Sequence, residues 1–349
     1  MRNTKIQWTH SAINAVMGCD GCELWPPSSK VRTAILEKLH SETNISVGIL
    51  KPIVSRAVED RPTSVIYQDR KSIAAEITAA LELAPTISMM VVDVIRDIAK
   101  CYAGMQGTMR AGHKGYADQF EIPKLFPGRI AEAARWGLPA QKEVDDKPWI
   151  AGLPRLIFVS DMGDALSKSV PFEYLRDEII KNVISPDGQR HIWLWLTKRP
   201  ERMAQFAAWL GQGGIEWPKN LMAMTTVTEQ TKDGRVDELR KVSAKMRGLS
   251  IEPLFGPIKL DLTGIDWVIV GGGSDVLAEP FHVEWAMDLR DQCAKAGVAF
   301  FLKQLGKNPF YQGKPIDLEN RHGGNWNEWP EEWRIREFPA AFKTLVTLS

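Results

Sequence analysis

The run Ile192-Trp193-Leu194-Trp195-Leu196 is followed at once by the polar residues Thr197-Lys198-Arg199 and then by Pro200. Five apolar residues in a row with turn residues behind them indicate a strand buried on both faces. Pro200 suits the first position of a helix, and residues 201–210 carry a helical pattern. The stretch therefore predicts a strand, a polar connection and a helix.

The same unit recurs along the second half of the chain. Short apolar runs occur at 156–159, 192–196, 221–224, 248–251, 267–270 and 298–302, and further helical patterns occur at 172–183 and 283–296. Repeated strand–helix units predict parallel strands with right-handed crossovers, in a barrel or in an open doubly wound sheet.

Polar residues follow these apolar runs. In a parallel barrel the carboxyl ends of the strands converge on one mouth, where the chemistry takes place. The recurring polar endings therefore favour a (β/α) TIM-like barrel, partial or complete, although strands also end in polar loops that do nothing. The candidate site residues at these ends are Ser160, Asp161, Thr197, Lys198, Ser250, Glu252, Gly271, Gly272, Gly273 and Lys303.

Three of these residues are our candidate catalytic residues: Glu252, Lys198 and Asp161. Lys198 suits a cofactor carboxylate or a substrate phosphate, or else is a solvated cation at a helix start. Glu252 suits ribose hydroxyls or a substrate amine, or else pairs with Lys198 or Lys303. Asp161 can instead cap a helix. The three glycines at 271–273 allow backbone amides to approach a ligand, or simply form a tight strand exit.

Composition limits the classes of protein to which the chain can belong. Its 349 residues are 44% hydrophobic and 25% charged, which predicts a globular protein with a real core. The net charge of +1 gives no global attraction to nucleic acid or to an anionic membrane, so any such binding needs a local patch. We expect no membrane span and no signal peptide. Four cysteines do not make a secreted disulfide framework, and we expect a cytoplasmic protein.

Three cysteines form the most specific candidate site: Cys19, Cys22 and Cys101. Three thiolates can hold three irons of a [4Fe–4S] cluster and leave the fourth iron open to an exogenous chelate, such as the amino and carboxylate groups of S-adenosylmethionine. The alternatives are a structural zinc site completed by His10 or His113, and free thiols. We expect the fourth cysteine, Cys293, to be a small core residue.

The second and third of these cysteines have 78 residues between them (101 − 22 − 1). Helical patterns at 31–40, 72–83 and 88–100 predict a helical insertion, and closing so long a loop costs little extra entropy if the insertion folds compactly. We therefore expect a first strand and the start of the cluster loop at 1–22, the insertion at 23–100, a (β/α) barrel core at 101–310 and a tryptophan-rich cap at 311–349.

A set of collinear motifs resembles a known family. The motifs lie at 4–9, 14–19, 101–103, 158–164, 197–203, 249–254, 266–273 and 301–304. They resemble the phage-associated three-cysteine proteins, long of unknown function and grouped with radical S-adenosylmethionine enzymes. The resemblance covers about 1–20 and 101–330. It departs from the family where the insertion separates the second and third cysteines, and at Gly273, where relatives commonly have Glu, so a carboxylate contact there would come from Asp275.

The resemblance implies a radical S-adenosylmethionine enzyme on a radical-SAM-type barrel. The cofactor would be cleaved reductively to a 5′-deoxyadenosyl radical, which abstracts hydrogen from a substrate, with an electron donor such as flavodoxin or ferredoxin. The expected cofactor-binding residues are Tyr102, Ser160, Thr197, Lys198, Ser250, Glu252, Gly271, Gly272, Gly273 and Lys303. A phage-encoded protein of this kind would act in the host cytoplasm.

A local basic stretch suggests the substrate. Lys100, Arg110, His113, Lys114 and Lys124 lie around Tyr116 and Phe120, a composition that suits a phosphate backbone and an extruded base, or else a solvated surface. We therefore expect a nucleic-acid base as substrate, with rearrangement or modification of a thymine-derived base in phage DNA as the concrete form. The alternatives are a radical lyase for a DNA lesion and a nonenzymatic zinc or iron–sulfur DNA-binding module.

Overall fold

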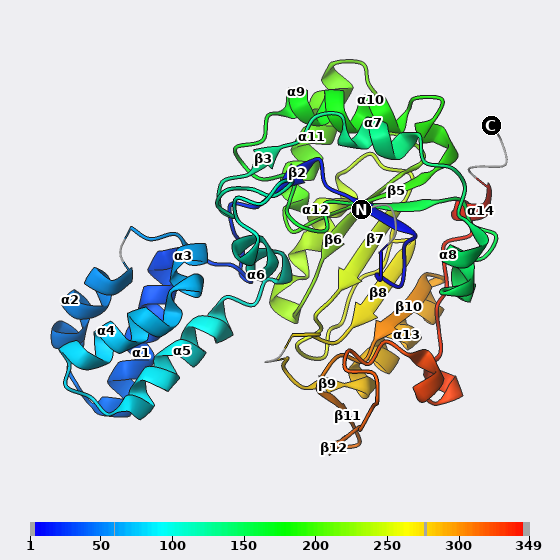
Figure 1. The fold of residues 1–349 in the computed structure, drawn as a ribbon. Helices are drawn as coiled ribbons and strands as arrows, with labels where there is room; N and C mark the ends of the chain where they lie inside the picture. The colour runs from blue at the N-terminus through cyan, green and yellow to red at the C-terminus, as the bar shows by residue number, and fades with distance from the viewer. Residues whose placement is uncertain (1–3, 59, 276–277, 345–349) are drawn as a thin grey trace. The chain divides into compact units, whose positions relative to one another are not determined.

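Seven parallel strands form one sheet, and their order in the sheet is their order in the chain. They are β1 (Ser11–Ile13), β4 (Leu156–Val159), β5 (Ile192–Thr197), β6 (Leu221–Thr226), β7 (Arg247–Ile251), β8 (Trp267–Gly271) and β10 (Ala299–Gln304). This computed structural model describes residues 4–58, 60–275 and 278–344. The strand order never reverses, unlike that of a doubly wound sheet, and the sheet curls into a half-barrel (Figure 1). The prediction of an α/β fold with parallel strands is confirmed, in its partial-barrel form.

All six strands expected in the second half of the chain are present, with small differences at their ends. For example, β6 continues to Thr226 because Thr225 and Thr226 still pair with Leu249 and Ser250 of β7. The expected helices are α11 (Pro200–Gln212), α13 (Val283–Ala296) and a helix at 172–183. The last contains a π-helical turn, Arg176–Ile180, between α9 (Phe172–Leu175) and α10 (Lys181–Val183).

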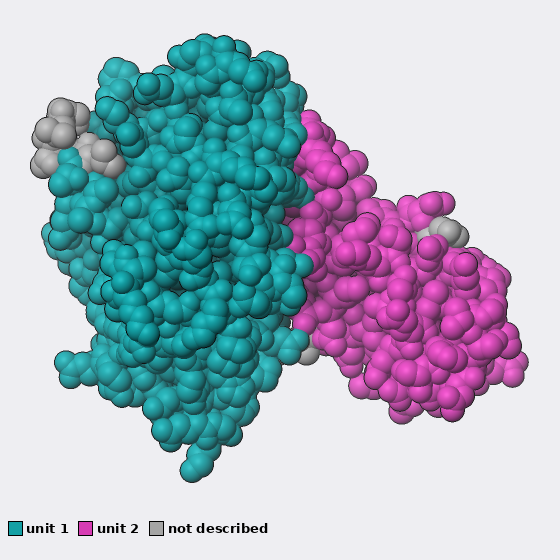
Figure 2. All heavy atoms as spheres, turned by 180° about the vertical axis from the view of Figure 1, so that it is seen from behind, with its two compact units in different colours: residues 1–15, 127–166, 170–349 teal, residues 16–126, 167–169 magenta. Residues whose placement is uncertain are grey.

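The chain divides into two compact units, which Figure 2 colours teal and magenta. The barrel unit comprises residues 1–15, 127–166 and 170–349, and the helical unit comprises residues 16–126 and 167–169. The barrel unit also contains α7 (Arg129–Ala134), α8 (Gln141–Asp145), α12 (Gly234–Arg240), α14 (Ala341–Thr344) and a small sheet of β9 (Phe281–His282), β11 (Pro309–Tyr311) and β12 (Lys314–Pro315).

The two faces of the half-barrel carry different side chains. Its concave face is apolar and includes Phe158 of β4, Leu194 of β5, Met224 of β6 and Ile269 of β8. On the opposite face Trp195 packs against helix α11 through Phe206, with 5.8 Å between ring centroids. This alternation follows from the two-residue period of a strand. It assigns each strand residue to one face, and so decides which polar side chains share a face at the carboxyl ends.

The edge strand β10 is covered by a segment near the end of the described chain. Leu302 donates to the carbonyl of Ile335 at 2.8 Å, and Glu337 donates to the carbonyl of Phe300 at 2.9 Å. Arg336, between them, donates through Nη2 to the carbonyl of Lys303 at 2.9 Å. Its guanidinium carbon lies 3.9 Å from the ring centroid of Trp149 and 4.9 Å from that of Trp326. The segment around Arg336 and Trp326 therefore packs against β10 and Trp149.

The helical unit has a core of its own. The helices are α1 (Ser28–Thr43), α2 (Val47–Val58), α3 (Thr63–Gln68), α4 (Arg70–Ala80), α5 (Pro85–Ile98) and α6 (Tyr102–Met109), and β2 (Val16–Met17) pairs with β3 (Lys124–Leu125). Ile35, Val54, Ile77 and Ile95 belong to one buried cluster between α1, α2, α4 and α5. The insertion is therefore helical, as predicted, and the cysteine segments lie in the same unit rather than in the barrel.

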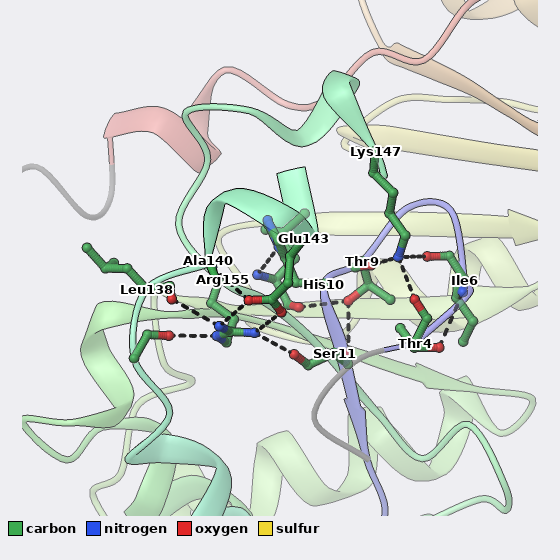
Figure 3. A network of polar contacts seen from close by, with 12 residues as sticks. Thr4, Ile6, Thr9, His10, Ser11, Leu138, Ala140, Glu143, Lys147 and Arg155 are labelled. Carbon is green, nitrogen blue, oxygen red and sulfur yellow. Dashed lines mark hydrogen bonds and ion pairs between the residues drawn. The ribbon is translucent and has the colours of Figure 1, made fainter. Parts of the chain in front are cut away.

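A buried polar network stands at the amino ends of β1 and β4 (Figure 3). Arg155, which has no exposed surface, makes a two-pronged ion pair with Glu143 at 2.8 and 3.0 Å. Lys147 donates to the carbonyls of Thr4, Ile6 and Thr9, each at 2.7 Å. Burial lowers the pKa of Lys147 to about 8, so the ammonium remains charged at pH 7. The network fastens the segment before β1 to α8 and β4.

His10 adds a pH dependence to this network. Its Nδ1 accepts the backbone N–H of Leu156 at 2.9 Å, and burial, with Arg155 and Lys147 nearby, lowers the pKa of His10 to about 3. Below its ordinary pKa of 6.5 the histidine takes up a proton only when the chain unfolds, so the stability it contributes is lost as pH falls from 6.5 towards 3. The free energy of unfolding should fall by at most about 1.4 kcal/mol for each pH unit in this range.

We expect His10→Asn, which keeps an acceptor for Leu156, to lower this acid sensitivity. The measurement is the free energy of unfolding in urea at pH 7 and pH 5. The wild type and a His322→Asn control, altered at an exposed histidine, should lose more stability than His10→Asn. Equal losses in all three proteins would contradict the assignment.

None of the helices in the described part of the chain combines the length and the apolar character needed to cross a bilayer.

Candidate functional site

The three candidate cysteines belong to one hydrogen-bonded assembly in the helical unit. Cys19 donates its N–H to Phe120 at 2.8 Å, Cys22 and Trp25 exchange two backbone bonds of 3.1 Å, and Cys101 donates to Leu24 at 2.8 Å. The chain segments around residues 19–25 and 101 are thus held side by side although the helices α1 to α5 separate them in sequence.

Two glycines shape the loop that carries Cys19 and Cys22. Gly18 and Gly21 have φ values of +90° and +91°, which side-chain-bearing residues rarely adopt. A Cβ at either position would also lie 2.6 Å from a carbonyl oxygen, that of Phe120 or that of Trp25. The backbone conformation of the loop therefore requires glycine at both glycine positions of the Gly-Cys-x-Gly-Cys pattern.

Cys101 stands at the start of α6. Its Sγ accepts the N–H of Gly104 at 3.4 Å, and a sulfur at this position faces the positive end of the helix dipole. Cys19 is buried, and Cys22 and Cys101 are partly exposed. Among the described residues, no three His, Cys, Asp or Glu side chains have the arrangement of a metal site. The donor set suits an iron–sulfur cluster by its chemistry, because soft thiolates with amide donors are its usual ligands.

Gly104 sets the packing beneath these thiols. A Cβ at Gly104 would lie 2.4 Å from Cε3 of Trp25, a buried ring whose indole N–H donates to Glu121 at 2.8 Å. Because the ring cannot move without losing that bond, we expect Gly104→Ala to destabilise the helical unit by roughly 1–3 kcal/mol. Gly48→Ala is the matched control, since the nearest atom to its Cβ is 3.9 Å away in the same unit. Urea denaturation followed by tryptophan fluorescence would measure both, and equal stability of the two variants would disprove the role of Gly104.

The carboxyl ends of the strands bring a second set of predicted residues together in the barrel unit. Pairing places Thr226 opposite Ser250, and Ser250 opposite Ile269, whose side chain is on the concave face. Thr226 and Ser250 therefore stand on the concave face, one layer above Met224. The concave surface changes from apolar to polar towards the mouth, as the barrel interpretation predicts.

Glu252 and Lys303 form an ion pair at this end of the half-barrel, with 18% and 16% of their side chains exposed. Glu252 directly follows β7, Lys303 lies in β10, and β8 lies between these two strands. The predicted alternative partner of Glu252 is thus present, and the pair is a small group of opposite charges on the concave side.

Ser160 and Asp161 follow β4 at the same end. Ser160 has a φ of +72°, and its buried hydroxyl has no hydrogen-bond partner in the described structure. Asp161 accepts a hydrogen bond from the Asn14 side chain, and Asn14 in turn accepts the N–H of Met162 at 2.9 Å. Burial raises the pKa of Asp161 above its ordinary value, and the bond from Asn14 opposes that shift.

Thr197 has a different environment from the one expected of a cofactor ligand. Its hydroxyl lies 2.9 and 2.8 Å from the two carboxylate oxygens of Asp164, which also pairs with Arg199 at 2.8 Å. In β5 it shares a face with Trp195, on the side opposite the apolar concave surface. Lys198 donates its backbone N–H to the same Asp164 at 3.1 Å, and its side chain is half-buried.

The three glycines at the end of β8 and directly after it have separate environments. A Cβ at Gly271 would lie 3.5 Å from Cδ of Glu252, whereas at Gly272 it would lie 2.4 Å from the Leu305 carbonyl oxygen. Gly273 accepts the N–H of Lys307 at 2.8 Å. Gly272 thus serves the close packing of two loops, and Gly271 lies beside the Glu252–Lys303 pair.

The comparisons with known proteins give a family. A family model described as "Protein of unknown function (DUF5131)" matches residues 93–330, which is 238 residues or about two thirds of the chain. The chain belongs to the DUF5131 family. No curated protein and no solved structure matches it. The DUF5131 match includes Cys101 and all the strand-end candidates but leaves Cys19, Cys22 and most of the insertion outside.

The basic stretch after Cys101 is only partly available to a partner in this DUF5131 chain. Tyr102 is 61% exposed, but Phe120 is buried against Trp25, with 5.5 Å between ring centroids. Arg110 covers the ring of Tyr116 at 5.4 Å and donates to its hydroxyl. Tyr116 is therefore engaged by Arg110 and Phe120 is buried, whereas Tyr102 is an exposed aromatic residue of this stretch.

Asn14, Thr226, Gly104 and Arg336 take part in these arrangements and were not among the predicted site residues. Thr226 could have been predicted from the two-residue period of the strand, because it lies two residues after Met224 and so shares its face. The contacts of Arg336 with three tryptophans give no local sequence signal, since they depend on tertiary packing.

Proposed function

We propose that this protein is a radical S-adenosylmethionine enzyme that modifies a nucleic-acid base. The single observation that carries the proposal is the hydrogen-bonded assembly that gathers the backbones of Cys19, Cys22 and Cys101 across a long helical insertion. Three cysteine ligands match a [4Fe–4S] cluster with an open iron. When bound, the cluster and S-adenosylmethionine would supply a 5′-deoxyadenosyl radical, with the electron coming from a donor such as flavodoxin or ferredoxin.

The chain's own residues have two tasks in this proposal. The helical unit holds the thiols, donates the Gly104 N–H to the Cys101 sulfur and shields Cys19 by burial. The barrel unit presents Ser160, Ser250, Glu252 and Lys303 at the carboxyl ends of its strands, where parallel barrels bind their ligands. Burial raises the pKa of Asp161, so its carboxyl group holds a proton more readily than that of an exposed aspartate.

The proposed substrate is a thymine-derived base in phage DNA, acted on in the host cytoplasm. This step is supported by exposed Tyr102 and by the exposed cations Arg110 and Lys114 nearby, which suit a base and a phosphate backbone. Mass spectrometry of nucleosides from phage DNA made with and without the gene would test it. An unchanged nucleoside profile would remove the DNA base from the proposal and leave the radical chemistry in place.

Anaerobic reconstitution tests the enzyme class. The full chain, loaded with iron and sulfide and reduced with dithionite, should bind about four irons and release 5′-deoxyadenosine from S-adenosylmethionine. A single tetrahedral zinc, or a cluster without 5′-deoxyadenosine release, would overturn it in favour of a nonenzymatic metal-bound module.

A further inference from the structure

Two departures from regular sheet structure lie at the Glu252–Lys303 pair. The β8–β10 register shifts between Leu302 and Gln304, so Lys303 is the extra residue of a bulge. A bulge disrupts the ladder locally, and the side chain of Lys303 at this bulge pairs with Glu252. Gly271 of β8, between them, has no side chain to separate the two charges.

Hydrogen bonds also fix the backbone next to both members of the Glu252–Lys303 pair. Arg336 donates to the carbonyls of Leu302 and Lys303 at 3.2 and 2.9 Å, which fixes the backbone of the bulge. On the other side, Leu254 donates to the carbonyl of Gly271 at 3.1 Å, so the turn after Glu252 is fastened to β8. A carboxylate and an ammonium group thus occupy fixed, adjacent positions in a half-buried place.

Such a pair offers one strong acceptor next to one strong donor. An uncharged ligand can bind both groups at once if one of its edges carries an N–H next to a carbonyl oxygen. Thymine has this edge, with N3–H next to O4, on the side that pairs with adenine in duplex DNA. The buried, unpartnered hydroxyl of Ser160 at the same ends of the strands adds a further polar group for a ligand.

We propose that Glu252 and Lys303 recognise the base-pairing edge of an unpaired thymine, Glu252 accepting N3–H and Lys303 donating to O4. This inference rests on the proposed function and narrows its substrate. Because the edge read by the pair is occupied in a duplex, the base must be single-stranded or extruded before it binds.

The amino acid part of S-adenosylmethionine is the competing ligand, because an amine and a carboxylate also complement the pair. In the proposed function those groups bind the cluster iron, and the chain runs into the Cys19–Cys22 loop from β1. Because the cluster iron takes those groups, the Glu252–Lys303 pair is left for the substrate.

The test compares two ligands that differ by one methyl group. Binding of thymidine 5′-monophosphate and of 3-methylthymidine 5′-monophosphate to the full chain is measured by saturation-transfer NMR titration, without reductant. Methylation removes the N3–H, so we expect roughly 10-fold to 100-fold weaker binding. Glu252→Gln and Lys303→Met should weaken binding of the unmethylated nucleotide by a similar factor. Their matched controls are Glu238→Gln and Lys241→Met, from a surface ion pair at the end of α12, which should bind as the wild type does.

Each outcome decides the proposal. Equal affinity for the two nucleotides, no binding of either, or wild-type affinity in Glu252→Gln would overturn it. Weaker S-adenosylmethionine binding in Glu252→Gln with unchanged nucleotide binding would assign the pair to the cofactor. Circular dichroism shows whether the variants fold, and the ligand comparison on the wild type stands even if Lys303→Met does not. Because the assay needs no cluster, its failure is distinct from failure of the radical chemistry.

Discussion

Cys101→Ala, reconstituted anaerobically and reduced with dithionite, should release no 5′-deoxyadenosine from S-adenosylmethionine. The variant loses a proposed iron ligand that also stands at the start of α6, where its sulfur accepts the N–H of Gly104. With two cysteines left, the iron content should fall and the visible absorption of the cluster should disappear. The spectrum is a readout independent of turnover.

Cys293→Ala is the matched control for this experiment. Cys293 is buried in α13, and burial raises the pKa of its thiol to about 12, so it is not a thiolate at neutral pH. This variant should keep the cluster and release 5′-deoxyadenosine at the wild-type rate. A Cys101→Ala protein that retains both would disprove the ligand assignment, since the measurement does not depend on the substrate.

Arg155→Met should destabilise the barrel unit by about 3–5 kcal/mol, because it leaves the carboxylate of Glu143 in a buried place without its counterion. Burial by itself would raise the pKa of Glu143, but the hydrogen bonds from Arg155 and from the Ala140 N–H keep this pKa below its ordinary value. Arg155 also donates to the carbonyls of Gly137 and Leu138, and these oxygens lose a partner as well. Urea denaturation followed by circular dichroism at pH 7 measures the loss.

Two further variants identify the cause of that loss. Arg290→Met removes an arginine from an exposed pair with Asp291 and should cost at most about 1 kcal/mol. The double variant Arg155→Met with Glu143→Leu removes both charges and should recover part of the stability. If the double variant is less stable than Arg155→Met alone, the unpaired charge is not the cause.

The sequence predicts the strands well because each of them is buried on both faces. A run such as Leu156-Ile157-Phe158-Val159 is typical of such a strand, and the polar residues after each run mark the carboxyl end of the strand. The helix at 283–296 has the expected bounds because Gly297 ends it with a φ of +68°. Helix α2 was missed, since it contains Pro52 and the sequence pattern there is interrupted.

The candidate site could be predicted by residue type but not by arrangement. Thr197 lies on the face opposite the concave surface, as the two-residue period of β5 requires. A prediction based only on the polar residues at strand ends does not distinguish the two faces. The Glu252–Lys303 pair lies at a bulge that no residue pattern in 299–304 predicts. The gathering of the cysteines depends on backbone bonds from Leu24, Trp25 and Phe120, and such contacts between distant segments leave no local pattern.

The segment Ile335–Glu337 has a consequence for solubility. By bonding to Phe300 and Leu302 it occupies amide and carbonyl groups of β10 that would otherwise point into solvent at the border of the sheet. Exposed strand borders recruit strands from other molecules and lead to aggregation. A chain shortened before residue 335 would therefore bare a hydrophobic strand containing Phe300, Phe301 and Leu302, and intermolecular β-pairing would compete with the native state.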